Sequence, residues 1–400
     1  MPAPERMRVG WDVGGAHVKA CLMQAGEVLD VAQWPCPLWL GLTHLDAVLA
    51  QAGQRWPMAA TLPHAVTMTG EMVDLFAHRQ DGVQRIAARM ASALAGPVHF
   101  FAGDRGWCGA AEAGALWPHV ASANWLATAR HVARWAGARG GSGVLVDIGS
   151  TTTDLIAFRG GAVLGTSRTD SQRLASGELV YQGVVRTTLC ALATRIAFQD
   201  AVLYVMNEFF ATTADVYRLT GELDPAHDQH PSADGAPKDA APSRQRLARM
   251  VGLDAHDAPA EDWQTFALAW RAAQLAEIGG QLRRVLAFHG LGDEALVVGA
   301  GCGAFLLPDL CVAAGLAPGV PRFDYGSDVV RTATEAAGGN GGGHAGDHGG
   351  GNDGGHCGGY GGSNGGSNGG SNGGQAGLRA WARVCAPSVA VAALFDEEAT

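Results

Sequence analysis

The chain has 400 residues, 47% of them hydrophobic and 16% charged, which is long enough for two domains that each bury a core. The 28 basic and 38 acidic residues give a net charge of −10 without a basic run, which argues against a nucleic-acid-binding protein. No apolar run approaches the ~18 residues of a membrane span and the eight cysteines form no CxxC pair, so we expect no membrane contact and reduced thiols in the cytoplasm.

The first third of the chain is predicted to alternate strands and helices. Three short strands at 8–13, 17–24 and 27–33 are separated by the glycine turns Gly14-Gly15 and Ala25-Gly26. They are followed by a helix over 42–55, strands at 65–69 and 97–101, and helices over 83–94 and 121–135. This alternation favours an α/β lobe.

The opening strand–turn–strand pattern occurs twice. Asp12-Val-Gly-Gly-Ala-His-Val-Lys19 and Asp147-Ile-Gly-Ser-Thr-Thr-Thr-Asp154 start 135 residues apart, and the second copy lies among predicted strands at 143–148, 153–159 and 162–166. Such self-similarity predicts an internal duplication. We therefore expect two similar lobes, residues 1–140 and 141–400, which meet in a glycine-rich crossing at 136–143.

The remaining residues are assigned to the second lobe. We predict helices over 178–196, 262–288 and 303–314, a strand at 295–298 before the Gly299–Gly303 loop, a polar loop at 224–242, and an apolar helix or strand at 380–395. The tract 338–374 is rich in Gly, Ser, Asn and His and predicts a disordered insertion. Its polar side chains favour adventitious over specific metal binding: His344, Asp347, His348, Asp353, His356 and Cys357.

The two repeated turns are the candidate phosphate loops. Their glycines allow tight turns that bring N–H groups to phosphate oxygens, and the hydroxyls of the second copy add donors: Gly14, Gly15, Gly149, Ser150, Thr151 and Thr152. Asp12 and Asp147, at strand ends, are predicted to hold a hydrated Mg²⁺. Lys19 either offers a positive charge to a phosphate or is a solvated strand residue. Asp154, at the same position of the second copy, is predicted to lie on the side that holds the metal.

Further candidates have two interpretations each. Gly299, Gly301 and Gly303 either admit a ligand to the backbone or make a tight strand–helix turn. Arg173 is a candidate phosphate clamp. Glu178 is a candidate acid, base or metal helper, or lies in the first turn of a helix capped by Ser176. Glu208 is a candidate base or a surface residue. The segment from Trp34 to Trp39 either walls a substrate pocket or packs in the first lobe.

Several longer segments carry a resemblance to a known family. The opening Gly10-Trp-Asp-Val-Gly-Gly-Ala-His-Val-Lys19 resembles the hydantoinase/oxoprolinase-like branch of the actin/Hsp70/sugar-kinase superfamily. Within that branch, a longer set resembles the methanofuran-biosynthesis synthases of tetrahydromethanopterin-linked C1 transfer: Pro37–Trp39, Thr69–Met72, Ala121–Ala127, Asp147–Asp154, Gly177–Tyr181 with Gly183, and Glu208–Arg218. The resemblance implies a two-lobed actin-like ATPase fold, that is, a duplicated ribonuclease H-like fold.

The resemblance also implies a reaction. That family joins an (aminomethyl)furanylmethyl diphosphate to the phenol oxygen of γ-glutamyltyramine, which makes an ether and releases pyrophosphate. Mg²⁺ is then the expected cofactor, ATP is not expected, and the partners are a small diphosphate and a phenolic amine. Metal and diphosphate binding would fall to Asp12, Asp147 and Asp154. The general base would be Glu178 or Glu208. An ATP-dependent kinase or cyclic-amide hydrolase, and a non-catalytic nucleotide sensor, remain the competing hypotheses.

Overall fold

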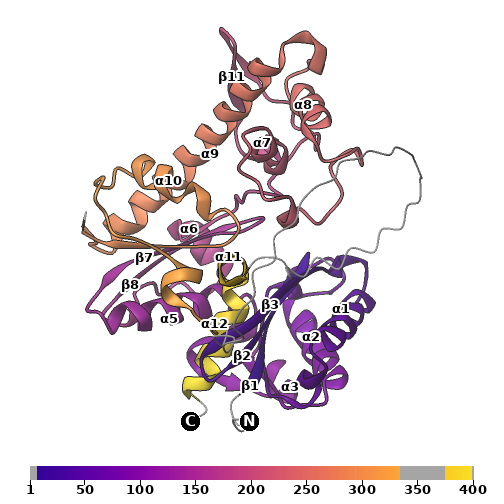
Figure 1. Cartoon of the computed structure of the whole chain (residues 1–400), viewed down its shortest axis with the longest axis vertical. Helices are drawn as coiled ribbons and strands as arrows, with labels where there is room; N and C mark the ends of the chain where they lie inside the picture. The colour runs from indigo at the N-terminus through magenta and orange to yellow at the C-terminus, as the bar shows by residue number, and fades with distance from the viewer. Residues whose placement is uncertain (1–6, 293, 334–373, 399–400) are drawn as a thin grey trace, which may run out of the picture.

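The structure is a computed structural model that describes residues 7–292, 294–333 and 374–398. The predicted insertion at 338–374, with its histidines and Cys357, lies outside the described residues except for Gly374. The described chain forms two large mixed sheets with helices on their faces (Figure 1). The α/β class is therefore confirmed.

The first sheet has seven strands in the order β15-β3-β2-β1-β4-β5-β6. Their bounds are β1 Met7–Val13, β2 His17–Gln24, β3 Glu27–Pro35, β4 His64–Met68, β5 Val98–Phe101, β6 Trp107–Cys108 and β15 Arg331–Thr332. The central strand β1 pairs antiparallel with β2 and parallel with β4. Its residues are almost all buried because helices cover both faces of the sheet.

Different helices cover the two faces of this sheet. Helices α1 (Thr43–Arg55) and α2 (Arg79–Ala93) pack with Val9, Trp11 and Val66 on the outer face. On the other face, α5 (Asn124–Gly137) and α12 (Ala386–Glu398) pack with Cys21 and Met23. The short helices α3 (Ala110–Ala113) and α4 (Trp117–Val120) complete this part of the chain.

The second sheet has the order β10-β8-β7-β13-β14, with β9 paired to β8. Its strands are β7 Ser142–Ile148, β8 Thr153–Arg159, β9 Ala162–Val163, β10 Leu179–Val180, β13 Leu296–Ala300 and β14 Arg322–Asp324. The long helix α9 (Ala260–Phe288) and α10 (Leu307–Ala313) cover one face, and α5 packs on the other. Helix α5 thus belongs to a core that both sheets share (Figure 1).

A smaller cluster lies beyond the second sheet, at the top of Figure 1. It contains the hairpin β11 (Arg195–Phe198) and β12 (Ala201–Tyr204), the helices α7 (Thr213–Leu219) and α8 (Ala240–Arg249), and the first half of α9. Buried Trp263, Phe266 and Trp270 of α9 fill its core. Helices α6 (Asp170–Ser176) and α11 (Gly374–Val384) lie nearer the sheets.

Most of the expected elements are present within one to four residues of their predicted ends, but the helix predicted over 178–196 is wrong. That segment contains β10, a 3-10 turn at Leu189–Ala191 and the start of β11. Ser176 ends α6 instead of capping a later helix, and Gly177 follows it with a left-handed φ of +84°. The N–H groups of Val184, Val185 and Arg186 bond to loop carbonyls, which leaves none for helical turns.

The C-terminal elements cross between the two sheets. Strand β15 pairs with β3, and α12 packs on β1, β2 and β4 of the first sheet. The division at residue 140 stays a prediction, while these segments of the range 141–400 lie on the first sheet. Among the described residues, no single helix has the length and apolarity to cross a membrane, although α11 and α12 meet that test together as a pair bent by 90°.

Candidate active site

The two predicted phosphate loops are closed by the same backbone hydrogen bond. In the first loop the N–H of Gly14 donates to the carbonyl of His17 at 2.9 Å, and in the second the N–H of Gly149 donates to the carbonyl of Thr152 at 2.8 Å. These residues hold equivalent places in the two eight-residue segments. The duplication predicted from the sequence is therefore confirmed in the geometry of the turns.

The residue that ends each segment lies directly opposite the residue that begins it. Asp12 pairs with Lys19 across β1 and β2, and Asp147 pairs with Asp154 across β7 and β8. Opposite residues of an antiparallel pair project to the same face of the sheet. The first hairpin thus sets a carboxylate beside an ammonium group, and the second sets two carboxylates together.

Three aspartates and Lys19 form one electrostatic cluster. Burial raises the pKa of Asp12 to about 6, with Lys19 opposing and Asp154 adding to the shift. Burial, and then repulsion from Asp154, raises the pKa of Asp147 to about 7. Burial also raises the pKa of Asp154, against the attraction of Arg173. The fold therefore holds carboxylates together at a cost that a bound cation would relieve.

Lys19 belongs to this cluster and is not a solvated strand residue. Its Nζ donates to the carbonyl of Val384, at the end of α11, at 2.9 Å. Burial lowers the pKa of Lys19, but the negative charges of Asp12 first and also of Asp147 help to outweigh burial and leave that pKa raised. Lys19 therefore remains a cation beneath the two loops.

The second loop is held by the chain that follows β10. The N–H of Val184 donates to the carbonyl of Gly149 at 3.1 Å, and the N–H of Arg186 donates to that of Ser150 at 2.8 Å. A Cβ at Gly183 would lie 2.5 Å from the carbonyl of Gly149, so only glycine allows this approach. The Oγ of Ser150 is buried and has no hydrogen-bond partner among the described residues, which leaves it for a ligand.

The third glycine loop lies against Asp147. Gly301 has a φ of +81°, and a Cβ there would lie 2.5 Å from the Oδ1 of Asp147. The N–H of Gly303 donates to the carbonyl of Ile148 at 2.8 Å, and Gly299 lies within β13. The loop therefore makes the tight turn that was one of its two interpretations. Its nearness to Asp147 also keeps it at the edge of the candidate site.

Arg173 lies inside the protein, where Asp154, Glu178 and Trp125 hold it, although its Nε has no hydrogen-bond partner among the described residues. Its guanidinium pairs with Asp154 and donates to the carbonyl of Glu178 at 3.3 Å. The guanidinium carbon also lies 4.1 Å from the ring centroid of Trp125, and the side chain is 2% exposed. Its position supports orientation of Asp154 rather than direct contact with a ligand.

The two candidate bases have different surroundings, and Glu178 adjoins Leu179, which pairs with Asp154. Glu178 is buried, accepts a hydrogen bond from the Oγ of Ser176 at 2.8 Å, and lies 3.7 Å from the Nε2 of His289. Glu208 is exposed on the segment after β12. Within the described ranges, no hydrogen bond or ion pair joins either glutamate to Asp12 or Asp147. The base assignment therefore stays a prediction without geometric support.

Asp12 and Asp147 fit the donor set of a hydrated Mg²⁺. That ion is usually held by one or two carboxylates together with water and phosphate oxygens. The Oδ1 of Asp12 is buried and lacks a hydrogen-bond partner among the described residues. The described part of the chain contains no cluster of three or more metal-ligating side chains, so any metal at Asp12 and Asp147 would need further oxygens from water or a substrate.

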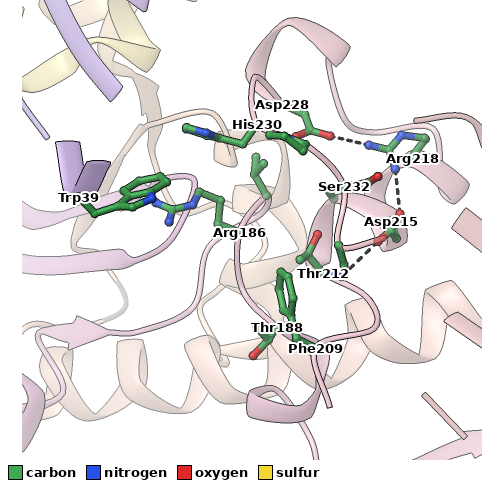
Figure 2. A pocket seen from close by; sticks show the side chains of 14 residues that line it. Trp39, Arg186, Thr188, Phe209, Thr212, Asp215, Arg218, Asp228, His230 and Ser232 are labelled. Carbon is green, nitrogen blue, oxygen red and sulfur yellow. Dashed lines mark hydrogen bonds and ion pairs between the residues drawn. The ribbon is translucent and has the colours of Figure 1, made fainter. Parts of the chain in front are cut away.

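A cavity of about 390 Å³ lies between Trp39 and residues of the segment 185–233, two of which, Arg186 and His230, bond to the second and the first loop. Its walls include aromatic, hydroxyl and charged side chains: Trp39, Arg186, Thr188, Phe209, Thr212 and His230. Figure 2 shows Arg186 extending toward the Trp39 ring, with the guanidinium carbon 5.7 Å from the ring centroid. Trp39 thus walls a pocket, whereas Trp34 packs against Trp56 in the core.

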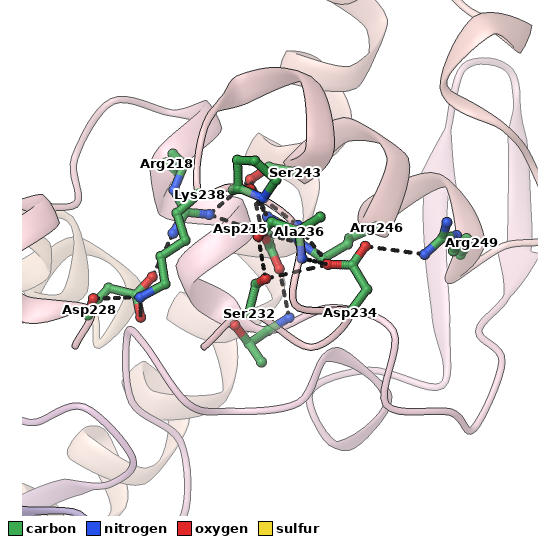
Figure 3. Close-up of polar contacts among 12 residues, drawn as sticks. Asp215, Arg218, Asp228, Ser232, Asp234, Ala236, Lys238, Ser243, Arg246 and Arg249 are labelled. Atoms are coloured by element: carbon green, nitrogen blue, oxygen red, sulfur yellow. Dashed lines mark hydrogen bonds and ion pairs between the residues drawn. The ribbon is translucent and has the colours of Figure 1, made fainter. Parts of the chain in front are cut away.

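The segment 228–238 carries His230 across to the first sheet. Its first residue, Asp228, pairs with Arg218 at 2.6 Å and with Lys238 at 3.1 Å, which closes the segment on itself (Figure 3). Gln229 bonds to the side chain of Gln33 at 3.3 Å, and His230 bonds to the first phosphate loop. The segment therefore links the two halves of the molecule over the cavity.

Buried Asp215 anchors the other side of this segment. It accepts hydrogen bonds from the Oγ of Ser243 at 2.9 Å and from the Nε of Arg246 at 2.8 Å (Figure 3). Arg246 in turn pairs with Asp234 at 3.0 Å. Because buried ion pairs need several partners to offset their desolvation, this network favours one fixed position for the segment.

Sequence reasoning missed Arg186 and His230. Neither lies in a recognisable motif, and His230 belongs to a loop that was predicted only as polar. The nearest signal is Gly183, three residues before Arg186, which belongs to the segments that carry the family resemblance. Their approach to the cavity depends on contacts between segments more than 100 residues apart in the chain.

Comparison with solved structures concerns the fold. The nucleotide-free structure of an acetone carboxylase, described as acting in ATP-dependent acetone carboxylation, superposes with a TM-score of 0.52 at 9% identity. The match covers 79% of this chain and 68% of that chain. The match shows that this chain shares the α/β fold of that enzyme over most of its length, and the duplicated hairpins agree with the two-lobed fold expected from the sequence.

The sequence comparisons are more specific. The hydantoinase/oxoprolinase family model matches residues 63–336, so the chain belongs to that family. A protein of Methanocaldococcus jannaschii named (4-{4-[2-(gamma-L-glutamylamino)ethyl]phenoxymethyl}furan-2-yl)methanamine synthase is 31% identical over 248 residues, which are 62% of this chain and 72% of that protein. A Methanococcus vannielii protein with the same name is 30% identical over 161 residues, 38% of this chain and 72% of its own length.

Proposed function

We propose that this chain is a methanofuran-type coenzyme biosynthesis enzyme. It would condense (aminomethyl)furanylmethyl diphosphate with the phenol oxygen of γ-glutamyltyramine, or of a related tyrosine-derived amine, and release pyrophosphate. The observation that carries the proposal is the similarity to two synthases whose named product contains a phenoxymethyl-furan ether. The duplicated loops and the aromatic cavity supply the two binding regions that such a condensation needs.

The diphosphate is assigned to the two loops. Gly14 and Gly149 begin turns whose backbone can approach phosphate oxygens, and the unpartnered Oγ of Ser150 is available as a donor. Lys19 supplies positive charge beneath the loops. Mg²⁺ held by Asp12 and Asp147 would neutralise charge that develops on the leaving pyrophosphate.

The phenolic acceptor is assigned to the cavity. Trp39 and Phe209 offer aromatic surface, and Arg186 offers positive charge at the end that borders the second loop. In the reaction, the phenol oxygen would form a bond to the furanylmethyl carbon. The bond between that carbon and diphosphate would break, and its electron pair would leave with pyrophosphate. A furanylmethyl carbon tolerates partial positive charge, so stabilising the leaving group lowers much of the barrier.

The compartment proposed is the cytoplasm. All seven cysteines of the described residues are free thiols, which is typical of a reducing compartment. The proposed partners are the two small substrates, and the proposed reaction consumes no ATP.

The direct test incubates the purified protein and Mg²⁺ with the furanylmethyl diphosphate and γ-glutamyltyramine, with and without ATP. Mass spectrometry would follow the ether and an enzymatic assay would follow pyrophosphate. We expect equal amounts of ether and pyrophosphate without ATP. ADP formed from ATP without ether would overturn the proposal in favour of a kinase or a cyclic-amide hydrolase.

A further inference from the structure

His230 lies where the cavity meets the first phosphate loop. Its Nε2 is 3.0 Å from the carbonyl oxygen of Ala16. Because a carbonyl oxygen only accepts hydrogen bonds, this contact places the ring proton on Nε2. In a neutral ring the other nitrogen, Nδ1, then carries the free lone pair, and the side chain lines the cavity (Figure 2).

The surroundings of His230 keep its ring neutral. Burial lowers the pKa of His230 most, and the positive charge of Arg186 lowers it next; the bond to Ala16 opposes them, Lys238 lowers the pKa further and Asp228 raises it. The ring of His17 also faces His230, with centroids 4.6 Å apart. Burial most, and then the neighbouring His230, Lys19 and Arg186, lower the pKa of His17 well below its usual value, so it adds no proton of its own.

Arg186 is a persistent cation close to this neutral ring. Its backbone is fixed by the 2.8 Å bond to the carbonyl of Ser150, and its guanidinium carbon lies 5.7 Å from the ring centroid of Trp39. No acidic side chain pairs with Arg186 among the described residues, whereas Arg218 on the same cavity wall pairs with Asp215 and Asp228. A neutral imidazole and an unpaired guanidinium thus share one cavity.

We propose that His230 is the general base that accepts the proton of the acceptor's phenol hydroxyl on Nδ1, with Arg186 stabilising the phenolate oxygen. This inference rests on the proposed condensation. The phenol proton passes to Nδ1, the freed oxygen pair forms the bond to the furanylmethyl carbon, and the electron pair of the breaking bond leaves with pyrophosphate. The imidazolium then returns its proton to solvent.

The geometry favours His230 over the two glutamates. Glu178 is held by Ser176 beside His289, Glu208 is exposed, and neither is among the residues that line the cavity. A phenol titrates near pH ~10, so an unassisted acceptor is almost wholly protonated at neutral pH. A base that accepts the phenol proton and a cation that stabilises the phenolate oxygen both favour this proton transfer. His230 supplies the base and Arg186 supplies the cation.

The test replaces His230 by glutamine, which keeps a donor for the carbonyl of Ala16 but cannot act as a base. We expect His230→Gln to lower kcat/KM with γ-glutamyltyramine by about 10²–10⁴-fold. With ring-fluorinated acceptors, whose phenols ionise near neutral pH, the loss should shrink to less than about 10-fold. Inhibition by added pyrophosphate should keep the wild-type inhibition constant.

Three outcomes would overturn the assignment. An unchanged rate in His230→Gln, or an equal loss with all acceptors, would assign His230 a structural role only. Ether absent from the wild-type reaction itself would remove the proposed function and this role with it. The control His256→Gln, at a side chain 81% exposed, should match the wild type in rate, and thermal melts would exclude misfolding.

A second measurement does not depend on turnover. NMR titration of the full protein, with the His230 signal assigned by its loss in His230→Gln, would give the pKa of that ring directly. We expect Arg186→Gln to raise this pKa because the neighbouring positive charge is lost. An unchanged pKa would separate the two side chains and overturn their joint role.

Discussion

The two phosphate loops share a backbone but differ in charge. Both close with a hydrogen bond from the glycine N–H to the carbonyl three residues later, and both sit between antiparallel strands. At the eighth position the first copy has Lys19, which bonds to the carbonyl of Val384, and the second has Asp154, which pairs with Arg173. The duplication therefore preserved geometry while the charges diverged.

This difference has a chemical consequence. Lys19 is the one member of the cluster whose charge lowers the pKa of both Asp12 and Asp147, while Asp154 raises both. The second loop is thus poised to bind a cation and the first to tolerate an anion. A metal-bound diphosphate carries both charges, and substitutions in the cluster would test this division of roles.

The largest expected effect follows from neutralising the loop aspartates. Asp147→Asn and Asp12→Asn should each lower the rate of ether formation by about 10²–10³-fold, since each removes a carboxylate proposed to hold the Mg²⁺ that neutralises the leaving pyrophosphate. Steady-state kinetics with saturating Mg²⁺ would measure the loss. Wild-type rates in both variants would show that the cluster has no part in the reaction.

The same variants should gain stability without metal. Because the folded state raises the pKa of Asp147 to about 7, from 3.8 in the unfolded chain, the folded protein binds more protons and wild-type stability falls as pH rises between about 4 and 7. Asn cannot ionise, so Asp147→Asn should melt about 2–4 °C above the wild type at pH 8 in EDTA and equal it near pH 4. A lower melting temperature at pH 8 would contradict this.

The next effect concerns the Arg173–Asp154 pair. Arg173→Gln leaves Asp154 without its partner and should destabilise the protein by about 3 kcal/mol. Adding Asp154→Asn should recover part of this loss, because the buried charge is then gone. Denaturant unfolding of the wild type, both single variants and the double variant would measure the coupling, and strictly additive losses would refute it.

A smaller effect is expected from the cation of the first loop. Lys19→Met removes the attraction that lowers the pKa values of Asp12 and Asp147, so both should rise further. As the pH falls, activity that requires ionised aspartates would then disappear at a higher pH than in the wild type. The acid limb of the pH–rate profile should therefore move up by as much as about one pH unit. An unshifted acid limb would remove Lys19 from the cluster's electrostatics.

The smallest effects are expected at the glutamates. Glu208→Gln should change kcat/KM less than about 2-fold because the side chain is exposed and does not line the cavity. Glu178→Gln should leave kcat near the wild-type value and cost about 1 kcal/mol of stability through its bond to Ser176. A 100-fold loss in either variant, restricted to acceptors with weakly acidic phenols, would transfer the role of base away from His230.

Local patterns explain which parts of the fold were predictable. The strands around Asp12 and Asp147 are apolar runs interrupted by glycine turns, and α9 shows apolar residues at helical spacing, so short-range preferences agree with the final structure. The failure over 178–196 has the opposite cause. Its apolar spacing favours a helix, but the N–H groups of Val184–Arg186 are used by the second phosphate loop.

By itself, the sequence determined the duplicated loops, the aspartates at their strand ends and the family of the protein, because each lies in a contiguous motif. Only the tertiary structure decided that Arg173 is buried against Trp125, that Lys19 reaches Val384, and that Arg186 and His230 meet Trp39 around one cavity. These contacts join segments distant in the chain, and they form because packing the two sheets around α5 and α12 fixes which loops face one another.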